Sequence, residues 1–290
     1  MRSRREGWSL WLIALAGTLV IIALAIVGLD RAMRVRAMDE TRAAASNDAA
    51  LLAAGLESEL NKFTLVPRVL SVDPEVATLL AGDGRDLAVL NRRLAALAQQ
   101  TNAAAIYLMD ARGLTLASSN WDRPDSFVGS NYGFRSYFAE ALREGMASDF
   151  ALGTVSRRPG LYLAQRVGPP TRPLGVVAIK VEFDSLESKW RDAKAGVFVT
   201  DGDGIVLLSS NPEWRFHAAK RPAGKATVQQ TVSDYPARDT ARDALRFGVE
   251  RITPLVLPTA GVAGSPVQMV EHIRPIAPTG WDLHLLSDPA

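Results

Sequence analysis

The residues best suited to chemistry lie between positions 131 and 180, and their types favour the binding of an anion. Tyr132 and Arg135 stand three residues apart at the predicted start of a helix, so both side chains can face one space. Backbone N–H groups in the first turn of a helix attract negative charge. Lys180 interrupts the apolar run Val176 to Val181, and a lysine there is costly unless it enters a wet pocket or pairs with an acid.

The surroundings of Lys180 leave two interpretations open. In the first, its strand is central and the ammonium group enters the pocket. In the second, Lys180 faces solvent from an edge strand, or it pairs with Glu182 or Asp184.

Hydroxyl groups complete the predicted site. An arginine fork and a lysine point charge on opposite sides of a pocket, with hydroxyl groups between them, would suit a small molecule that carries a carboxylate at each end. The candidate ligand-binding residues are Tyr132, Arg135, Tyr137, Thr154, Ser156, Tyr162 and Lys180.

The sequence contains no catalytic or metal-binding pattern, so we expect no catalytic residue, metal site or cofactor in it. His217, His272 and His284 lack the spacing of a zinc-binding pair, and the chain has no cysteine. It also has neither a serine-hydrolase elbow nor a phosphate-binding glycine loop. Asp201-Gly-Asp-Gly204 resembles the start of a calcium loop, but the acid required further on is missing, so a turn is expected. The net charge of +2 argues against a nucleic-acid partner.

One structural unit occurs twice among the elements that must position the site. Residues 106–120 and 197–211 both consist of an apolar strand, a D-x-x-G turn and a second apolar strand that ends in Ser-Ser-Asn. This is the pattern of a β-hairpin in which glycine supplies the positive φ of the turn. Chance similarity between two hairpins is the alternative to a duplicated α+β unit.

A membrane anchor is predicted before both units. The segment from Trp8 to Leu29 carries no charge and is long enough to span a hydrocarbon core of roughly 30 Å. A cleaved signal peptide is the alternative, but its apolar part would be shorter. The flanking arginines are balanced, so the positive-inside rule does not decide the orientation. Because a short N-terminal tail usually stays inside, we expect a cytoplasmic tail at 1–7, a transmembrane helix at 8–29 and the rest of the chain outside the cytoplasm.

A long signalling helix is expected over residues 30–66, with Pro67 ending it. Four residues share one of its faces: Leu52, Leu56, Leu60 and Phe63. That face packs either against the chain's own core or in a dimer seam.

Two antiparallel-sheet domains are expected to follow, at 67–190 and 191–290. In the first, helices at 74–80, 87–97 and 134–144 accompany the hairpin and strands at 150–152, 161–167 and 174–183, in a sheet with its helices on one side. In the second, strands are expected near 197–200, 205–209, 225–232, 267–275 and 281–286, and residues 236–264 have no assignment. The first domain resembles a PAS-like sensor domain.

Five segments carry a more specific resemblance: Ser119-Asn-Trp121, Phe127-Val-Gly-Ser-Asn-Tyr-Gly-Phe-Arg-Ser-Tyr-Phe138, Ala151-Leu-Gly-Thr-Val-Ser156, Gly175-Val-Val-Ala-Ile-Lys-Val181 and Pro212-Glu-Trp-Arg-Phe216. They resemble the periplasmic double-Cache, or tandem PAS-like, input domain of the C4-dicarboxylate sensor histidine kinases of the DctB family. The resemblance runs from about residue 50 to the C-terminus. It departs at Ser136, where proline is usual, and at Leu161, where an aromatic residue is common. Both departures bear on the shape of the pocket.

The resemblance implies an α+β fold with an N-terminal transmembrane helix, a long helix and two tandem PAS-like domains. It implies that the membrane-distal domain binds succinate, fumarate or malate, and that the residues matching Tyr132, Arg135 and Lys180 hold the ligand. It also implies a homodimer in the inner membrane, with residues after about 30 in the periplasm. A response regulator would be reached through a kinase core that is not among these 290 residues and to which ATP and Mg²⁺ would belong.

Two other functions stay open. The same input domain could serve a chemoreceptor or a cyclic-dinucleotide enzyme and sense another small carboxylate or an amino acid. An anchored structural or interaction protein is the third class.

Overall fold

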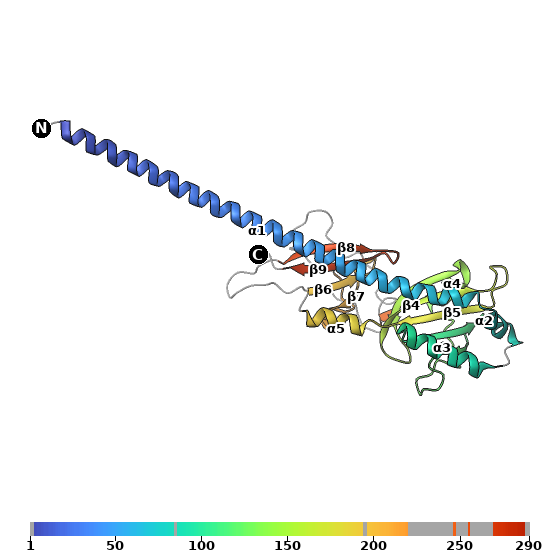
Figure 1. Cartoon of the computed structure of the whole chain (residues 1–290). Helices are drawn as coiled ribbons and strands as arrows, with labels where there is room; N and C mark the ends of the chain where they lie inside the picture. Colours follow the sequence, from blue (N-terminus) through green and yellow to red (C-terminus); the bar gives the residue numbers. More distant parts are fainter. Residues whose placement is uncertain are drawn as a thin grey trace.

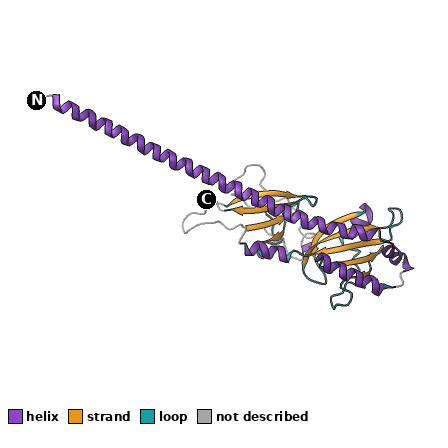
Figure 2. Ribbon diagram, in the orientation of Figure 1, coloured by secondary structure: helices purple, strands orange, loops and turns teal. Residues whose placement is uncertain are grey.

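A single long helix and two antiparallel sheets make up the fold (Figures 1 and 2). The computed structural model describes residues 3–83, 86–193, 196–219, 246–247, 255 and 269–287, with side chains described from residue 25 onward except at position 34. The helix, α1 (Ser3–Ser71), extends from the N-terminus and packs along both sheets. In the described part of the chain, no helix has an apolar stretch long enough to cross a membrane. The predicted span at 8–29 lies mostly among residues without described side chains, so it stays a prediction.

Pro67 was expected to end α1, but the helix continues to Ser71. A proline inside a helix costs about 3 kcal/mol, yet Val66 and Leu70 on the same stretch are buried in the core. The burial of these two side chains therefore outweighs the local signal. Leu56, Leu60 and Phe63 are also buried in the chain's own core, which is the first of the two alternatives for this face of the helix.

The first sheet has five antiparallel strands, as predicted, with β5 at its centre. Their order across the sheet is β2 (Thr115–Ser118), β1 (Ala105–Asp110), β5 (Gly175–Val181), β4 (Pro159–Val167) and β3 (Met146–Leu152). Every residue of β5 is buried, which is typical of a strand that is covered on both faces.

Helices cover both faces of this sheet, so the expectation of helices on one side is wrong. One face packs on α1 and α3 (Leu87–Thr101). A five-residue helix, α2 (Pro74–Thr78), and a π-helical turn (Leu79–Asp83) connect α1 to α3. The other face packs on α4 (Ser136–Glu144). The reason lies in β5, where Ile179 faces α1 and Ala178 faces the α4 side, so both faces need cover.

The second sheet contains four strands among the residues that the structure describes. Their order is β7 (Val206–Ser209), β6 (Gly196–Thr200), β9 (Trp281–Ser287) and β8 (Val270–Ile276). A short helix that the sequence analysis missed, α5 (Asp184–Asp192), connects the two sheets. The predicted strand at 225–232 lies outside the described residues, as does most of the unassigned segment 236–264.

The two hairpins share one turn geometry, which confirms the repeat. The Asp110 carboxylate accepts hydrogen bonds from two backbone N–H groups of its turn, at 2.8 and 2.9 Å, and the Asp201 carboxylate does the same at 2.9 Å each. Gly113 and Gly204 have φ values of 86° and 80°. The segment from Asp201 to Gly204 is therefore a turn, as predicted.

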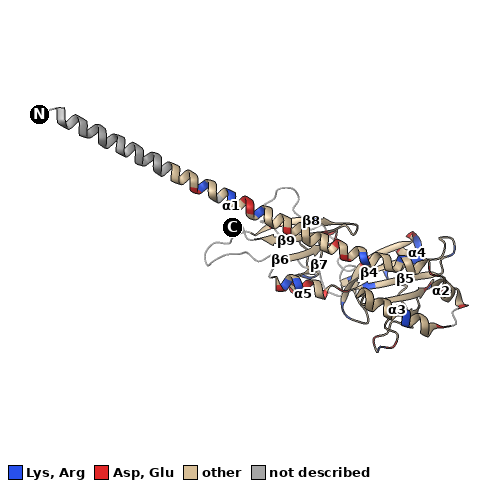
Figure 3. Ribbon diagram, in the orientation of Figure 1, with Lys and Arg blue, Asp and Glu red and all other residues tan. Residues whose placement is uncertain are grey.

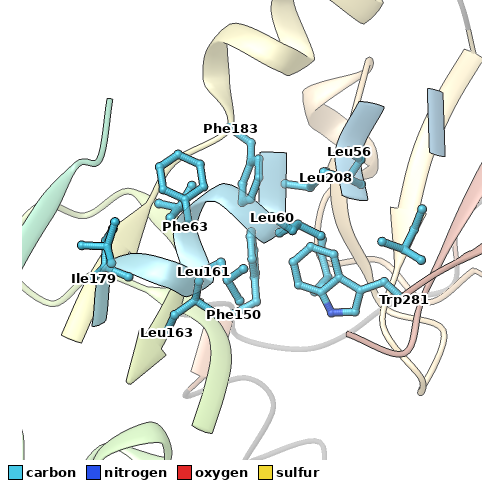
Figure 4. Packing of buried hydrophobic residues seen from close by; sticks show 14 of the residues in the cluster. Leu56, Leu60, Phe63, Phe150, Leu161, Leu163, Ile179, Phe183, Leu208 and Trp281 are labelled. Carbon is cyan, nitrogen blue, oxygen red and sulfur yellow. The ribbon is translucent and has the colours of Figure 1, made fainter. Parts of the chain in front are cut away.

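Aromatic side chains join the two sheet units into one hydrophobic core (Figure 4). The ring of Trp281, from the second sheet, lies 5.9 Å from that of Phe150 and 6.5 Å from that of Phe183, in both cases edge to face. Leu56 and Leu60 of α1 belong to the same cluster. Since this core includes both sheets and α1, the two units are not independently packed.

Aromatic rings pack together on the face of the second sheet that carries Phe198. Phe198, which corresponds to Tyr107 in the repeat, stacks on His284 with 4.4 Å between ring centroids, and Trp214 meets Phe198 edge to face at 5.9 Å. His284 is also fixed by Thr200 at 3.0 Å and by Glu271 at 2.7 Å.

Candidate ligand-binding site

A small pocket lies on the α4 side of the first sheet. The space between its lining residues amounts to about 210 Å³, a figure that includes open solvent at its mouth. Its lining residues are Tyr107, Phe127, Tyr132, Arg135, Tyr137, Gly153, Thr154, Val155 and Tyr162.

The loop before α4 is held against the first hairpin. The Tyr132 N–H donates to the Gly113 carbonyl at 2.8 Å, and the Asn131 side chain donates to the Arg112 carbonyl at 3.1 Å. A Cβ atom on Gly113 would lie 2.3 Å from the backbone nitrogen of Gly133, so only glycine permits this approach. The hairpin turn therefore fixes the position of Tyr132 in the pocket.

Tyrosines form the floor of the pocket. The hydroxyl groups of Tyr107 and Tyr137 are 2.7 Å apart, and the rings of Tyr137 and Tyr162 are stacked with centroids 4.9 Å apart. Burial raises the pKa of these three hydroxyl groups and also that of Tyr132. All four therefore remain protonated at neutral pH and can donate an O–H to an anion.

Arg135 is a buried cation without an anionic partner among the described residues. It occupies the N-cap position of α4 with an extended backbone, and it is only 9% exposed. One Nη donates to the Leu152 carbonyl at 2.7 Å, whereas Nε has no hydrogen-bond partner in the described structure. Because a buried charge is costly unless it is paired, this guanidinium group favours the entry of an anion.

Lys180 is buried as well, but its charge is already matched. It lies on the central strand β5 at 1% exposure. Its Nζ donates to Ser156 Oγ at 2.7 Å, to the Arg158 carbonyl at 3.0 Å and to the Glu182 carboxylate at 2.5 Å. Burial lowers the pKa of Lys180, and the Glu182 carboxylate opposes that shift. The strand is therefore central, as in the first interpretation, and the lysine pairs with Glu182, as in the second.

The structure places five of the seven predicted residues in the pocket lining. These are Tyr132, Arg135, Tyr137, Thr154 and Tyr162. Ser156, in the loop that follows β3, and Lys180, on β5, are not among the lining residues, but both lie next to the lining residue Gly153. A Cβ atom on Gly153 would lie 2.3 Å from Ser156 Oγ and 3.2 Å from Lys180 Nζ.

The two cations lie near one aromatic ring. Arg135 Cζ is 5.8 Å and Lys180 Nζ is 6.0 Å from the centroid of the Tyr162 ring. A ligand that contacts Tyr162 can therefore reach both positive groups if the Lys180 ammonium group is released toward the pocket.

Four further residues line the pocket that were not predicted from the sequence: Tyr107, Phe127, Gly153 and Val155. Tyr107 shares the pocket face of the sheet because it pairs with Ala178, two residues from Lys180 on β5, and residues two apart on a strand share a face.

The two departures from the family pattern, Ser136 and Leu161, lie in different surroundings, and Leu161 does not shape the pocket as expected. Leu161 packs in the core on the α1 side of the sheet, away from the pocket. Ser136 donates from Oγ to the Asp149 carboxylate at 2.5 Å, and the same carboxylate accepts from Arg246 Nε at 2.8 Å. Arg246 also lies 3.5 Å from the Asp201 carboxylate of the second unit. Ser136 thus begins a polar connection between the pocket helix and the second hairpin.

Comparison with known proteins identifies sensor proteins as relatives of this chain. It is 39% identical over 255 residues to the C4-dicarboxylate transport sensor protein DctB of Rhizobium meliloti strain 1021, over 88% of this chain and 39% of the relative. It is 35% identical over 193 residues to the protein of that name from Pseudomonas aeruginosa PAO1, over 65% of this chain and 31% of the relative. The chain therefore spans less than half the length of these relatives. No family model matches it.

Solved structures share its fold. The sensor domain of the V. cholerae histidine kinase DctB superposes with a TM-score of 0.68 at 24% identity, over 86% of this chain and 98% of that domain. The ligand-binding domain of the P. aeruginosa PAO1 amino-acid chemoreceptor PctC, in complex with GABA, gives a TM-score of 0.55 at 16% identity, over 86% of this chain and all of that domain. These comparisons confirm the resemblance to the sensor region of the DctB family and the predicted fold class.

Proposed function

We propose, on the premise that this chain is related to the DctB sensor proteins, that it is the sensor region of a two-component histidine kinase and that it binds a C4-dicarboxylate in the pocket beside α4. The related proteins carry C4-dicarboxylate transport sensing in their names. The ligand class, succinate, fumarate or malate, is proposed for this chain from that kinship and from the chemistry of the pocket.

The single observation that carries the proposal is the unpaired guanidinium group of Arg135. A charge-assisted hydrogen bond contributes about 1.5–3 kcal/mol, and the buried Nε is available to make one. The tyrosine hydroxyls and Thr154 surround the same space. Binding at upper to low micromolar affinity needs roughly 5–8 kcal/mol, which a few such contacts can supply.

The remaining elements of the proposal concern the whole protein. Residues 8–29 would anchor the sensor in the inner membrane, with the two sheet units in the periplasm. The sensor would act as a homodimer, and a kinase core that uses ATP and Mg²⁺ would pass the signal to a response regulator. The kinship with transport sensors supports these roles.

Calorimetric titration of the whole chain in detergent tests the proposal. Succinate, fumarate, malate and aspartate are titrated into the wild type, into Arg135→Ala and into Arg123→Ala. Arg123 is a matched control because it lies on the preceding loop, is 62% exposed and pairs with Asp125. We expect dicarboxylate binding that Arg135→Ala abolishes and Arg123→Ala leaves intact. Absence of heat from all four ligands with a folded wild type would overturn the dicarboxylate assignment.

An amino-acid ligand is the second candidate, and two observations favour keeping it. The fold is shared with an amino-acid chemoreceptor domain solved in complex with GABA, and the Glu182 carboxylate lies next to the site, where it could meet an ammonium group. Adding GABA to the titration separates the two. Binding of GABA without succinate would assign the pocket to amino acids.

A further inference from the structure

The Lys180 ammonium group has no proton left for a ligand in this structure. An ammonium group carries three donors, and all three are used, by Ser156 Oγ, the Arg158 carbonyl and the Glu182 carboxylate. The group is also absent from the pocket lining. A ligand carboxylate can therefore pair with Lys180 only if one of these three partners gives way.

Two of the partners are fixed by their own hydrogen bonds. The Arg158 carbonyl also accepts from the Gly153 N–H at 3.0 Å, which closes the loop after β3. Ser156 Oγ accepts from the Arg158 N–H at 3.3 Å within the same loop. Moving either partner would therefore open the loop that forms one wall of the pocket.

Glu182 is the partner that can leave without becoming unpaired. Its second oxygen, Oε2, is 3.0 Å from Arg158 Nε, and the Arg158 side chain is 56% exposed. A rotation of the Glu182 side chain would break the contact with Lys180 and keep the contact with Arg158, which also pairs with Asp184. The carboxylate would stay neutralised throughout this movement.

We propose that Glu182 is a specificity-determining residue that competes with the ligand for Lys180. This inference rests on the proposed function. The Glu182 carboxylate already pairs with Lys180 at 2.5 Å, so a ligand carboxylate that arrives at Lys180 meets a cation whose charge is already matched. Glu182 therefore lowers the affinity of this end of the pocket for an anion, whereas Arg135 at the other end has no such competitor among the described residues.

The consequence differs between classes of ligand. A monocarboxylate needs only Arg135 and does not involve Lys180. A dicarboxylate must displace Glu182 to engage its second carboxylate. Removing the charge of Glu182 should strengthen the binding of dicarboxylates selectively.

Calorimetric titration of the whole chain with succinate and with butyrate tests the inference. Both ligands have four carbons, but butyrate has only one carboxylate. We expect Glu182→Gln to bind succinate about tenfold more tightly than the wild type, equal to about 1.4 kcal/mol, and to bind butyrate unchanged. Asp184→Asn is the matched control, because Asp184 bonds to Arg158 and not to Lys180. It should change succinate affinity by less than about threefold.

Further variants separate the possible failures. In Lys180→Gln, adding Glu182→Gln should bring no gain, since the group for which Glu182 competes is missing. If Glu182→Gln does not fold, Glu182→Asp tests the same point, because its shorter side chain reaches Lys180 less well and should also tighten succinate binding. Equal or weaker succinate binding by the folded variant, with a wild type that binds, overturns the role of Glu182 but not the proposed function. Failure of the wild type and the variant to bind succinate, fumarate and malate overturns the proposed function itself.

Discussion

The carboxylate of Asp149 connects the pocket helix to the second unit, and replacing it with asparagine should measurably destabilise the fold. Its side chain is 11% exposed, and it accepts from Ser136 Oγ at 2.5 Å and from Arg246 Nε at 2.8 Å. In Asp149→Asn, the amide oxygen can still accept from Arg246 and the amide nitrogen can donate to Ser136. The shape and both hydrogen bonds are kept, so the variant removes only the charge.

The expected cost follows from the two bonds. A hydrogen bond to a charged group contributes about 1.5–3 kcal/mol, compared with about 0.5–1.5 kcal/mol for a neutral pair. The bond with Ser136 becomes neutral, whereas Arg246 remains a charged donor to the amide oxygen, so the free energy of unfolding should fall by about 1–1.5 kcal/mol. Arg246 keeps its contact with Asp201 at 3.5 Å, so a larger loss from a fully unpaired cation is not expected.

Urea unfolding of the whole chain, followed by tryptophan fluorescence, measures this cost. Asp125→Asn is the matched control, because the Asp125 carboxylate pairs with Arg123 at 2.9 Å but is 38% exposed. An exposed pair contributes about 0–1 kcal/mol. A loss below about 0.5 kcal/mol in Asp149→Asn, or one equal to that of the control, would refute the reasoning that burial strengthens this connection.

Three further predictions follow from buried groups. Trp281→Ala should lower the free energy of unfolding by about 3–5 kcal/mol, because it removes the ring between Phe150 and Phe183. Urea unfolding followed by circular dichroism should still show a single transition, and two separate transitions would contradict the shared core. Gly175→Ala should cost about 1–3 kcal/mol in thermal unfolding, because its Cβ would lie 2.1 Å from the Met109 carbonyl oxygen, and an unchanged melting temperature would contradict the close approach. Tyr107, Tyr132, Tyr137 and Tyr162 have pKa values raised by burial, so above about pH 10 the unfolded chain loses protons that the folded chain retains, and stability should fall as the pH rises. Ultraviolet titration of tyrosinate should show these four ionising only with unfolding, and full ionisation of a folded chain near pH 10 would contradict their burial.

Elements with a regular local sequence pattern could be predicted from the sequence alone. The hairpins at 106–120 and 197–211 have the turn that their D-x-x-G pattern predicts, with positive φ at Gly113 and Gly204. The apolar spacing of Leu87, Leu90, Leu94 and Leu97 predicts an amphipathic helix, and in α3 Leu90 and Leu94 are buried whereas Leu87 is exposed. In these cases a short-range pattern and the tertiary packing favour the same conformation.

Errors arose where packing at long range decided the structure. Pro67 was expected to end α1, but the burial of Leu70 keeps the helix intact beyond it. The strand β1 is apolar along almost its whole length, so no alternation showed which of its residues face the pocket, and Tyr107 was missed. The pairing of Lys180 with Glu182 appeared as one alternative, but only the structure shows that this pair and a central strand occur together.

The ring stack in the second sheet has a consequence for how a displacement at the pocket is transmitted. Where the first unit has its pocket against Tyr107, the second unit has the rings of Phe198, His284 and Trp214 in contact. A close-packed interior of this kind has low compressibility and transmits displacement. In the described part of the second copy, packed rings therefore occupy the position that corresponds to the pocket of the first copy. The described part of the second copy therefore serves as a stiff spacer between the pocket of the first copy and the N-terminal end of α1.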